Sequence, residues 1–206
     1  MKDIEKIEKA YDFLAKEFDK ICIKGNYIAP KELSYLILKK LNTKNPRILD
    51  LGCGTGLSAL NFIKKRYKVV GIDISKEMLD KSNDYCFEKL IQQDIEEPLN
   101  VLDYSFDAVI LCGSMEFVKN PLKLFKEINL KLKEKGLFAL GVAKKVEYSH
   151  FPNKKPYCLK LYSYTKEEIE PLFKEANFKI IKCKEFFAYK LNDGEIVNYY
   201  GYLLEK

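Results

Sequence analysis

One segment constrains the fold more than any other. It is the short apolar run from Ile48 to Leu51, which leads directly into Gly52, Gly54 and Gly56 in a G-x-G-x-G spacing. A run of that length before a turn is typical of a buried strand. Glycines adopt backbone angles that other residues avoid, and they let a ligand approach the main chain closely. The free amides and dipole of the following helix favour an anionic group. The segment therefore predicts a strand, a turn and a helix with a ligand at the turn.

Strands and helices alternate after this segment. Further strands are predicted at 68–73, 90–94, 106–112 and 137–143, and helices at 57–65, after Ser75 and at 121–133. Strands joined by helical crossovers form a parallel sheet that is covered on both faces. The last part predicts a helix at 166–176 and a hairpin of two strands at 177–187 and 195–204. The sequence thus predicts an α/β, Rossmann-like, doubly wound sheet that is mostly parallel and ends in an antiparallel hairpin.

The region before the first strand is helical in character. Apolar residues recur at three- and four-residue steps from Ile4 to Ile21, which is one stripe of an amphipathic helix, and a second helix is predicted at 31–41. We interpret residues 1–45 as a helical lid on a core formed by residues 46–206. A partner-binding face is the alternative. Because a domain usually takes about 100 to 200 residues, a single domain over residues 1–206 is expected.

Composition narrows the possible partners. The net charge is +6, but only two of the 36 basic residues are arginines, Arg47 and Arg66, and the lysines are mixed with glutamates. That pattern favours a solvated lysine surface over a nucleic-acid footprint. One histidine and six cysteines without a C-x-x-C pair argue against a metal site. No apolar run approaches the roughly 18 residues of a membrane span, and no leader is visible, so a soluble, cytoplasmic protein is expected. The oligomeric state is left open.

Three acids lie at the tips of three successive predicted strands. Asp50 is near the end of the first strand, Asp73 is at the tip of the second, and Asp94 is at the tip of the third. An acid about 20 residues after the first glycine suits the hydroxyls of an adenosine ribose. A single acid would be explained as well by helix or turn capping, but three beside a glycine turn favour a nucleoside site. Dinucleotide folds require G-x-G-x-x-G, whereas Leu57 stands at the last position here.

Five segments together resemble the class I S-adenosylmethionine-dependent methyltransferases. They are ILDLGCGTG at 48–56, VVGIDIS at 69–75, QQDIEEPL at 92–99, FDAVILCGSMEFV at 106–118 and LKEKGLFAL at 132–140. The stretches YDFLAKEFD at 11–19 and NYIAPKEL at 26–33 also resemble the subgroup related to the Williams-Beuren-region methyltransferase. The resemblance implies an enzyme with a seven-stranded sheet whose last strand is antiparallel. It further implies S-adenosyl-L-methionine as the methyl donor and S-adenosyl-L-homocysteine as the product.

The resemblance also implies roles at the methionine end of the ligand. Asp50 is expected to hold the ammonium group, directly or through water. Gly52 and Gly54 are expected to lie against the methionine moiety. Cys112 and Gly113, just past the fourth strand, are expected to border the sulfonium.

At the nucleoside end, the resemblance implies that Asp73 binds the ribose hydroxyls and that Ile74 packs against adenine. Asp94 is expected to receive the adenine amine, with Ile95 beside the ring. Tyr11 is expected to close over the cofactor from the N-terminal helix.

The methyl acceptor is constrained less. Residues 111–115 read LCGSM in place of the Asn/Asp-Pro-Pro-Tyr/Phe segment of base-modifying enzymes, so methylation of nucleic-acid bases loses support. His150, in a long irregular stretch, is the candidate general base, with an exposed histidine of no role as the alternative. Met115, Tyr148 and Tyr157 are candidates for the substrate pocket, and ordinary packing is the alternative for the tyrosines.

Three hypotheses for function follow. The leading one is methylation of a small molecule at oxygen, nitrogen or sulfur, because the chain is compact and no appended recognition domain is visible. A protein or RNA methyltransferase is the second, motivated by the positive net charge. The third is a non-catalytic S-adenosylmethionine-binding protein, because no catalytic residue is recognisable after the fourth strand.

Overall fold

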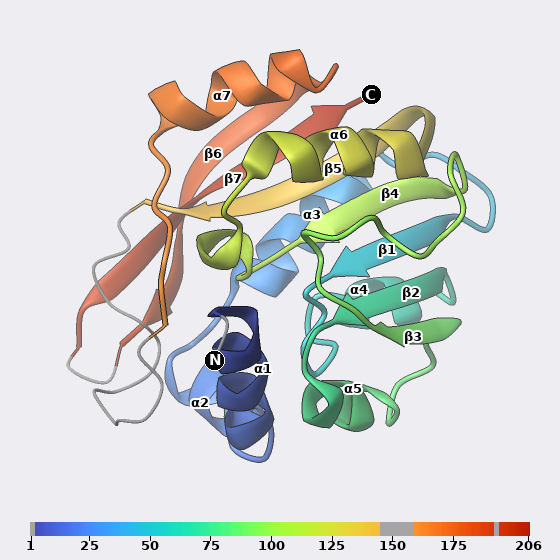
Figure 1. Cartoon of the computed structure of the whole chain (residues 1–206). Helices are drawn as coiled ribbons and strands as arrows, with labels where there is room; N and C mark the ends of the chain where they lie inside the picture. The colour runs from blue at the N-terminus through green and yellow to red at the C-terminus, as the bar shows by residue number, and fades with distance from the viewer. Residues whose placement is uncertain (1–2, 145–158, 192–193) are drawn as a thin grey trace.

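A mixed sheet forms the centre of the molecule (Figure 1). The computed structural model describes residues 3–144, 159–191 and 194–206. The strands within them are β1 (Arg47–Leu51), β2 (Lys68–Asp73), β3 (Lys89–Gln92), β4 (Phe106–Leu111), β5 (Leu132–Ala143), β6 (Lys179–Lys190) and β7 (Ile196–Glu205). Their order is β3-β2-β1-β4-β5-β7-β6. Strands β1 to β5 pair in parallel, and β7 pairs antiparallel with both β5 and β6. The predicted fold class is confirmed.

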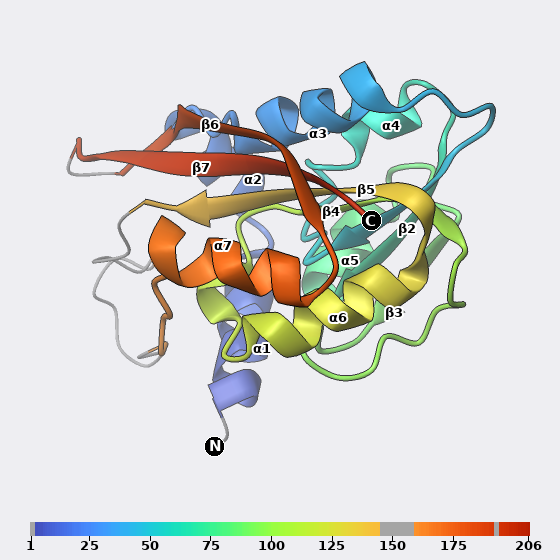
Figure 2. The same ribbon diagram turned by 90° about the horizontal axis from the view of Figure 1, so that it is seen from above.

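Helices cover both faces of this sheet. On one face lie α3 (Ala29–Lys40) and α4 (Leu60–Ile63), and on the other lie α6 (Pro121–Lys131) and α7 (Lys166–Glu175) (Figure 2). Helix α5 (Lys76–Ser82) packs against β2 and β3. Successive residues of β1 serve opposite faces: Ile48 packs in the cluster with α3 and α4, and Leu49 in the cluster with α6 and α7. Because both faces are covered there, the central strands β1 and β4 are buried along nearly all of their length and are mostly apolar rather than alternating.

The N-terminal region differs from the single helix that the stripe predicts. Helix α1 (Asp3–Leu14) ends before a turn at residues 15–17, and α2 (Phe18–Lys24) follows. Both helices lie beside the carboxyl ends of the parallel strands (Figure 1). Every residue of the predicted stripe lines the pocket described below: Ile4, Ile7, Tyr11, Leu14, Phe18 and Ile21. The apolar face therefore closes a cavity, and the break lets both helices turn that face inward.

Some boundaries also shift. The helix predicted at 57–65 is a helix only at Leu60–Ile63, because turns occupy the residues before it. Helix α6 ends at Lys131, and the chain continues directly into β5. A short 3-10 helix, η1 (Met115–Phe117), follows β4. No helix within the described residues is long and apolar enough to cross a membrane.

Candidate functional site

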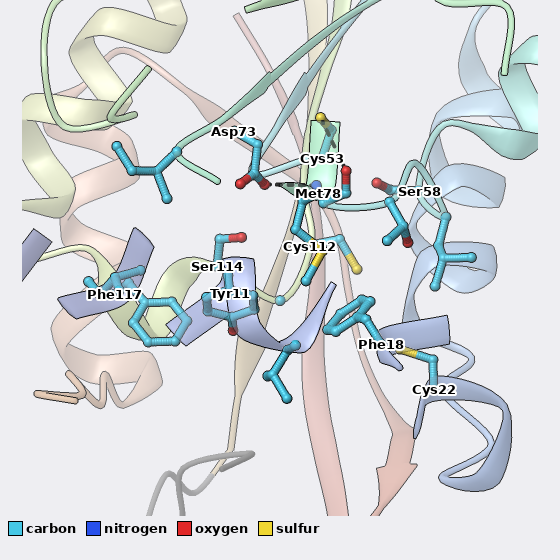
Figure 3. Close-up of a pocket in the computed structure, with 18 of the residues that line it drawn as sticks. Tyr11, Phe18, Cys22, Cys53, Ser58, Asp73, Met78, Cys112, Ser114 and Phe117 are labelled. Atoms are coloured by element: carbon cyan, nitrogen blue, oxygen red, sulfur yellow. Dashed lines mark hydrogen bonds between the residues drawn. The ribbon is translucent and has the colours of Figure 1, made fainter. Parts of the chain in front are cut away.

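A pocket of about 700 Å³ lies at the carboxyl ends of β1, β2 and β4. Strand order reverses between β1 and β4, which is where open α/β sheets bind ligands. The glycine loop after β1 forms the floor of this pocket, and α1 and α2 lie across the pocket from it. Figure 3 shows this arrangement: Tyr11 and Phe18 lie on the helical side, and Asp73, Cys53 and Ser58 lie on the side of the sheet. A volume of this size is in the range that holds a cofactor.

The glycine loop, residues 52–56, forms the pocket floor. Its three glycines all have left-handed backbone angles, which other residues rarely adopt. The φ angles are +63° at Gly52, +52° at Gly54 and +92° at Gly56. A Cβ on Gly52 would collide with Ser114, whose own Cβ would be 2.8 Å away. At Gly54, by contrast, an added Cβ would meet nothing within 4 Å. The main chain at Gly54 is therefore open to a ligand, whereas Gly52 is needed for close contact with the residues after β4.

The carboxylate of Asp73 ties this loop to the end of β2. Its Oδ2 accepts a hydrogen bond from the Gly54 amide at 2.8 Å, and its Oδ1 accepts one from the Ser75 amide at 2.9 Å. Asp73 lines the pocket although it is only 8% exposed. Burial, opposed by the backbone amides and reinforced by the nearby Asp12, raises the pKa of Asp73 to about 6. Both oxygens keep lone pairs that a ligand hydroxyl can use.

Asp50 lies behind the pocket wall rather than in it. It is fully buried, and its Oδ2 accepts a hydrogen bond of 2.6 Å from the Ser58 hydroxyl. Its Oδ1 has no hydrogen-bond partner, and burial raises the pKa of Asp50 to about 7. Ser58 itself lines the pocket, whereas Asp50 does not. Any contact of Asp50 with a ligand therefore passes through Ser58 or a water molecule.

Other predicted positions come together in the same pocket. Ile74, Asp94 and Ile95 line it from the segments after β2 and β3, and Asp94 Oδ1 accepts a hydrogen bond of 2.9 Å from the Glu96 amide. Cys112 lines it just past β4, and its sulfur lies 3.3 Å from the Tyr27 hydroxyl.

One predicted pocket residue lies elsewhere. Met115 is 1% exposed and belongs to the core cluster under α6, so it does not line the pocket. The turn of η1 explains this correction, because it points Met115 toward the core and presents Ser114 and Phe117 to the cavity. Tyr148, His150 and Tyr157 lie outside the described residues.

Polar contacts fasten the helices to the strand tips. Asp12 accepts hydrogen bonds from the Ser75 hydroxyl at 2.6 Å and from the Glu77 amide at 3.2 Å. Asp19 accepts one from the Thr55 hydroxyl at 2.6 Å. Between these contacts the Tyr11 ring stands edge-on to Phe117, with ring centroids 5.6 Å apart. The residues so contacted lie in the glycine loop, just after β2 and just after β4. The two helices therefore form a lid that is anchored to three sides of the pocket.

Sequence reasoning missed several residues here. Thr55, Ser58 and Phe117 line the pocket, and Glu116 is buried beside it. Burial raises the pKa of Glu116 to about 7. The signal for Thr55 and Ser58 was their place within and just after the glycine loop. Nothing in the sequence indicated that Glu116, a charged residue, would be only 4% exposed.

Part of the chain is similar in sequence to known methyltransferases. Residues 49–140 match a family model described as a methyltransferase domain. The protein YqeM of Bacillus subtilis (strain 168), which is named as a methyltransferase, is 35% identical over 104 residues, or 47% of this chain and 42% of that protein. A ubiquinone biosynthesis O-methyltransferase of Rickettsia bellii (strain OSU 85-389) is 27% identical over 210 residues, or 85% of this chain and 84% of that protein. The chain spans about half the length of the first curated relatives it matches.

Solved structures share the fold at low sequence identity. Magnesium protoporphyrin IX methyltransferase from Synechocystis PCC 6803, solved with bound S-adenosylhomocysteine, superposes with a TM-score of 0.76 at 14% identity and covers 100% of both chains. A Burkholderia thailandensis 1,6-didemethyltoxoflavin-N1-methyltransferase superposes with a TM-score of 0.72 at 16% identity, covering 98% of this chain and 88% of the other.

Proposed function

We propose that this chain is a class I S-adenosylmethionine-dependent methyltransferase that transfers a methyl group to a small molecule, because residues 49–140 match a methyltransferase domain and the fold is shared with methyltransferases of known structure. The acceptor atom is an oxygen, nitrogen or sulfur. The observation that carries the proposal is the open main chain at Gly54 beside the Asp73 carboxylate, within the pocket between the sheet edge and the two N-terminal helices. The closer resemblance to the Williams-Beuren-region subgroup stays a prediction.

The residues present fit the methyl donor. Gly52 and Gly54 form a floor that a methionine moiety can approach, since no side chain stands at Gly54. Asp50 keeps one buried oxygen without a partner behind Ser58, which suits an ammonium group reached through that hydroxyl or water. Asp73 offers carboxylate lone pairs to two ribose hydroxyls.

The rest of the lining suits the adenine and the reacting end. Ile74 and Ile95 offer apolar surface to a base, and Asp94 can accept its exocyclic amine. Cys112 borders the opposite end, and Tyr11 with Phe117 closes the pocket from the side of the lid.

Catalysis in such a site depends mainly on alignment. S-adenosylmethionine supplies, when bound, a methyl group that its sulfonium makes electrophilic. The chain has to bind it, hold the acceptor on the opposite side of the methyl group and exclude water. Positioning of this kind contributes about 7 to 11 kcal/mol. His150 as general base and Tyr148 and Tyr157 as pocket residues remain predictions.

The names of several relatives and structural neighbours favour a small-molecule acceptor. These proteins include enzymes named for ubiquinone biosynthesis and for 1,6-didemethyltoxoflavin. The pocket is enclosed by the lid and lined by aromatic side chains, which suits a small organic molecule better than a folded polymer.

Incubation of the protein with methyl-labelled S-adenosylmethionine and a metabolite extract is expected to label a low-molecular-weight product. Label found only in protein or RNA would replace the proposal by the macromolecular alternative. Binding of the donor without any labelled product would favour the non-catalytic alternative.

The lid contacts lead to a second prediction. Replacing Asp12 with alanine removes the acceptor for the Ser75 hydroxyl and the Glu77 amide. Since a charged hydrogen bond contributes about 1.5 to 3 kcal/mol, labelled S-adenosylhomocysteine should leave at least about tenfold faster in a chase experiment. Glu17→Ala is the control, because the exposed Glu17 side chain in the same lid pairs with Lys20 and with no other side chain among the described residues. Equal dissociation rates in the two variants would contradict the lid.

A further inference from the structure

A buried carboxyl with one unpartnered oxygen lies at the corner after β4. Glu116 is 4% exposed and lies in η1, and its Oε2 has no hydrogen-bond partner. In the part of the chain that the structure describes, Glu116 forms no ion pair, and its own backbone amide is the hydrogen-bond donor that lowers its pKa. Burying a carboxylate oxygen without a donor is costly, and native proteins rarely retain such an atom without a reason.

The surroundings of Glu116 are polar groups rather than inert packing. Burial raises the pKa of five groups from different segments, and the Glu116 carboxylate raises each pKa further: Tyr11, Tyr27, Cys112, Tyr189 and Tyr199. All except Tyr199 also line the pocket, whereas Glu116 itself does not. The carboxyl therefore lies behind the lining residues, among side chains that are uncharged at neutral pH.

Its position along the chain places it at the methionine end. Ser114, which precedes η1, and Phe117, which is its last residue, both line the pocket. Ser114 is the residue that a Cβ on Gly52 would strike, so the corner after β4 touches the glycine loop. Cys112, which borders the expected sulfonium position, lies four residues before Glu116.

We propose that Glu116 is the general base of the reaction, and that the acceptor therefore carries an O–H, N–H or S–H group at the atom to be methylated. This rests on the proposed function. The acceptor atom forms the new bond to the methyl carbon, and the carbon–sulfur bond breaks with its electron pair left on sulfur. The acceptor's proton moves to the Glu116 carboxylate through one water molecule, because Glu116 does not itself line the pocket.

Other groups near the pocket are less suited to this role. Burial raises the pKa of the Cys112 and Cys53 thiols far above neutrality, so neither forms a thiolate. Asp73 already accepts two backbone amides. Asp50 accepts the Ser58 hydroxyl, and its unpartnered oxygen is the one proposed above to serve the ammonium group. The pKa of Glu116, about 7, is near the value at which a general base works best.

The first test needs no acceptor. The sulfonium of S-adenosylmethionine is positive and the sulfur of S-adenosylhomocysteine is neutral, so only the donor gains affinity when Glu116 ionises nearby. The ratio of their affinities, measured by calorimetry, should rise about tenfold from pH 6 to pH 8. Asp50 and Asp73 also titrate there, so Glu116→Gln isolates the share of Glu116. An equal rise in wild type and Glu116→Gln would overturn the placement.

The second test measures transfer. Glu116→Gln should lower the rate of product labelling at pH 8 by about 10² to 10⁴-fold and abolish the rise in rate near pH 7. Tyr199→Phe is the matched control, because it removes the other unpartnered buried oxygen of the cluster and should keep the rate and its pH profile. A Glu116→Gln enzyme with wild-type rate would overturn the inference. Wild type that binds the donor but labels nothing would instead contradict the proposed function.

Folding is checked separately. The folded-state pKa of Glu116 is raised from 4.5 to about 7, so its contribution to stability is present below about pH 4.5 and is lost as the pH rises through 7. Glu116→Gln removes this buried charge and should raise the melting temperature at pH 8. Loss of transfer together with equal or higher stability separates a catalytic role from a structural one. A fall in melting temperature at pH 8 together with unaltered donor preference would assign Glu116 a structural role and overturn the inference.

Discussion

Replacing Asp73 with alanine should weaken the binding of S-adenosylhomocysteine by about 100-fold or more. The variant loses the carboxylate offered to two ribose hydroxyls, and hydrogen bonds to charged groups contribute about 1.5 to 3 kcal/mol each. It also releases the Gly54 and Ser75 amides that Asp73 holds, so the glycine loop loses its tie to β2. Isothermal titration calorimetry at pH 7.5, above the pKa of Asp73, measures the effect.

Two further variants make this result specific. Asp80→Ala removes an exposed acid of α5 whose one side-chain partner in residues 3–144, 159–191 and 194–206 is Lys76, and it should leave the affinity unchanged. Asp73→Asn keeps the shape and one acceptor oxygen, so its affinity should lie between those of wild type and Asp73→Ala. An Asp73→Ala protein that binds within twofold of wild type would remove Asp73 from the site.

Replacing Gly52 with alanine should lower the free energy of unfolding by about 2 to 4 kcal/mol. An alanine at a positive φ costs about 1 kcal/mol or more, and the added methyl group would overlap Ser114 in a closely packed corner. Chemical denaturation of the variant measures the loss. The same change should weaken S-adenosylhomocysteine binding, because the glycine loop must shift to relieve the overlap.

A second substitution separates the two costs. Ser114→Gly removes the atoms that the new methyl group would strike, so the double variant should recover the part of the loss that is due to overlap and keep the part due to the backbone angle. Gly54→Ala is the comparison, since it has a similar φ and open space, and its unfolding free energy should fall by only about 1 kcal/mol. A double variant no more stable than Gly52→Ala would contradict this account of the turn.

The parallel part of the sheet was predictable because its signal is local. The run from Ile48 to Leu51 and its glycines define a strand and a turn with few alternatives. The C-terminal hairpin was predictable for a similar reason, because the sequence Asn192-Asp193-Gly194 is a local turn signal between the strands that form β6 and β7. The break after Leu14 was not, because the apolar stripe continues through it at helical spacing. Which face a helix turns inward depends on the cavity, and the cavity is formed by segments far away in sequence.

The same limit applies to individual site residues. Sequence placed Asp73 correctly at a strand tip, where it reaches the pocket. It could not show that Asp50, inside its strand, would lie behind Ser58. Around η1, neighbouring side chains point alternately to the pocket and to the core. Ser114 and Phe117 line the pocket, whereas Met115 between them packs in the core, and the sequence does not show which residue takes which direction. Glu116 depends on burial from five segments, which no local pattern records.

The central claim is that the pocket beside the glycine loop binds S-adenosylmethionine, and calorimetry with three ligands tests it most directly. S-adenosylmethionine and S-adenosylhomocysteine should each bind at one site per chain and compete with each other, while a nicotinamide dinucleotide should give no binding heat, because the loop has the G-x-G-x-G spacing. Absence of binding by both sulfur compounds, or equal binding of the dinucleotide, would contradict the account.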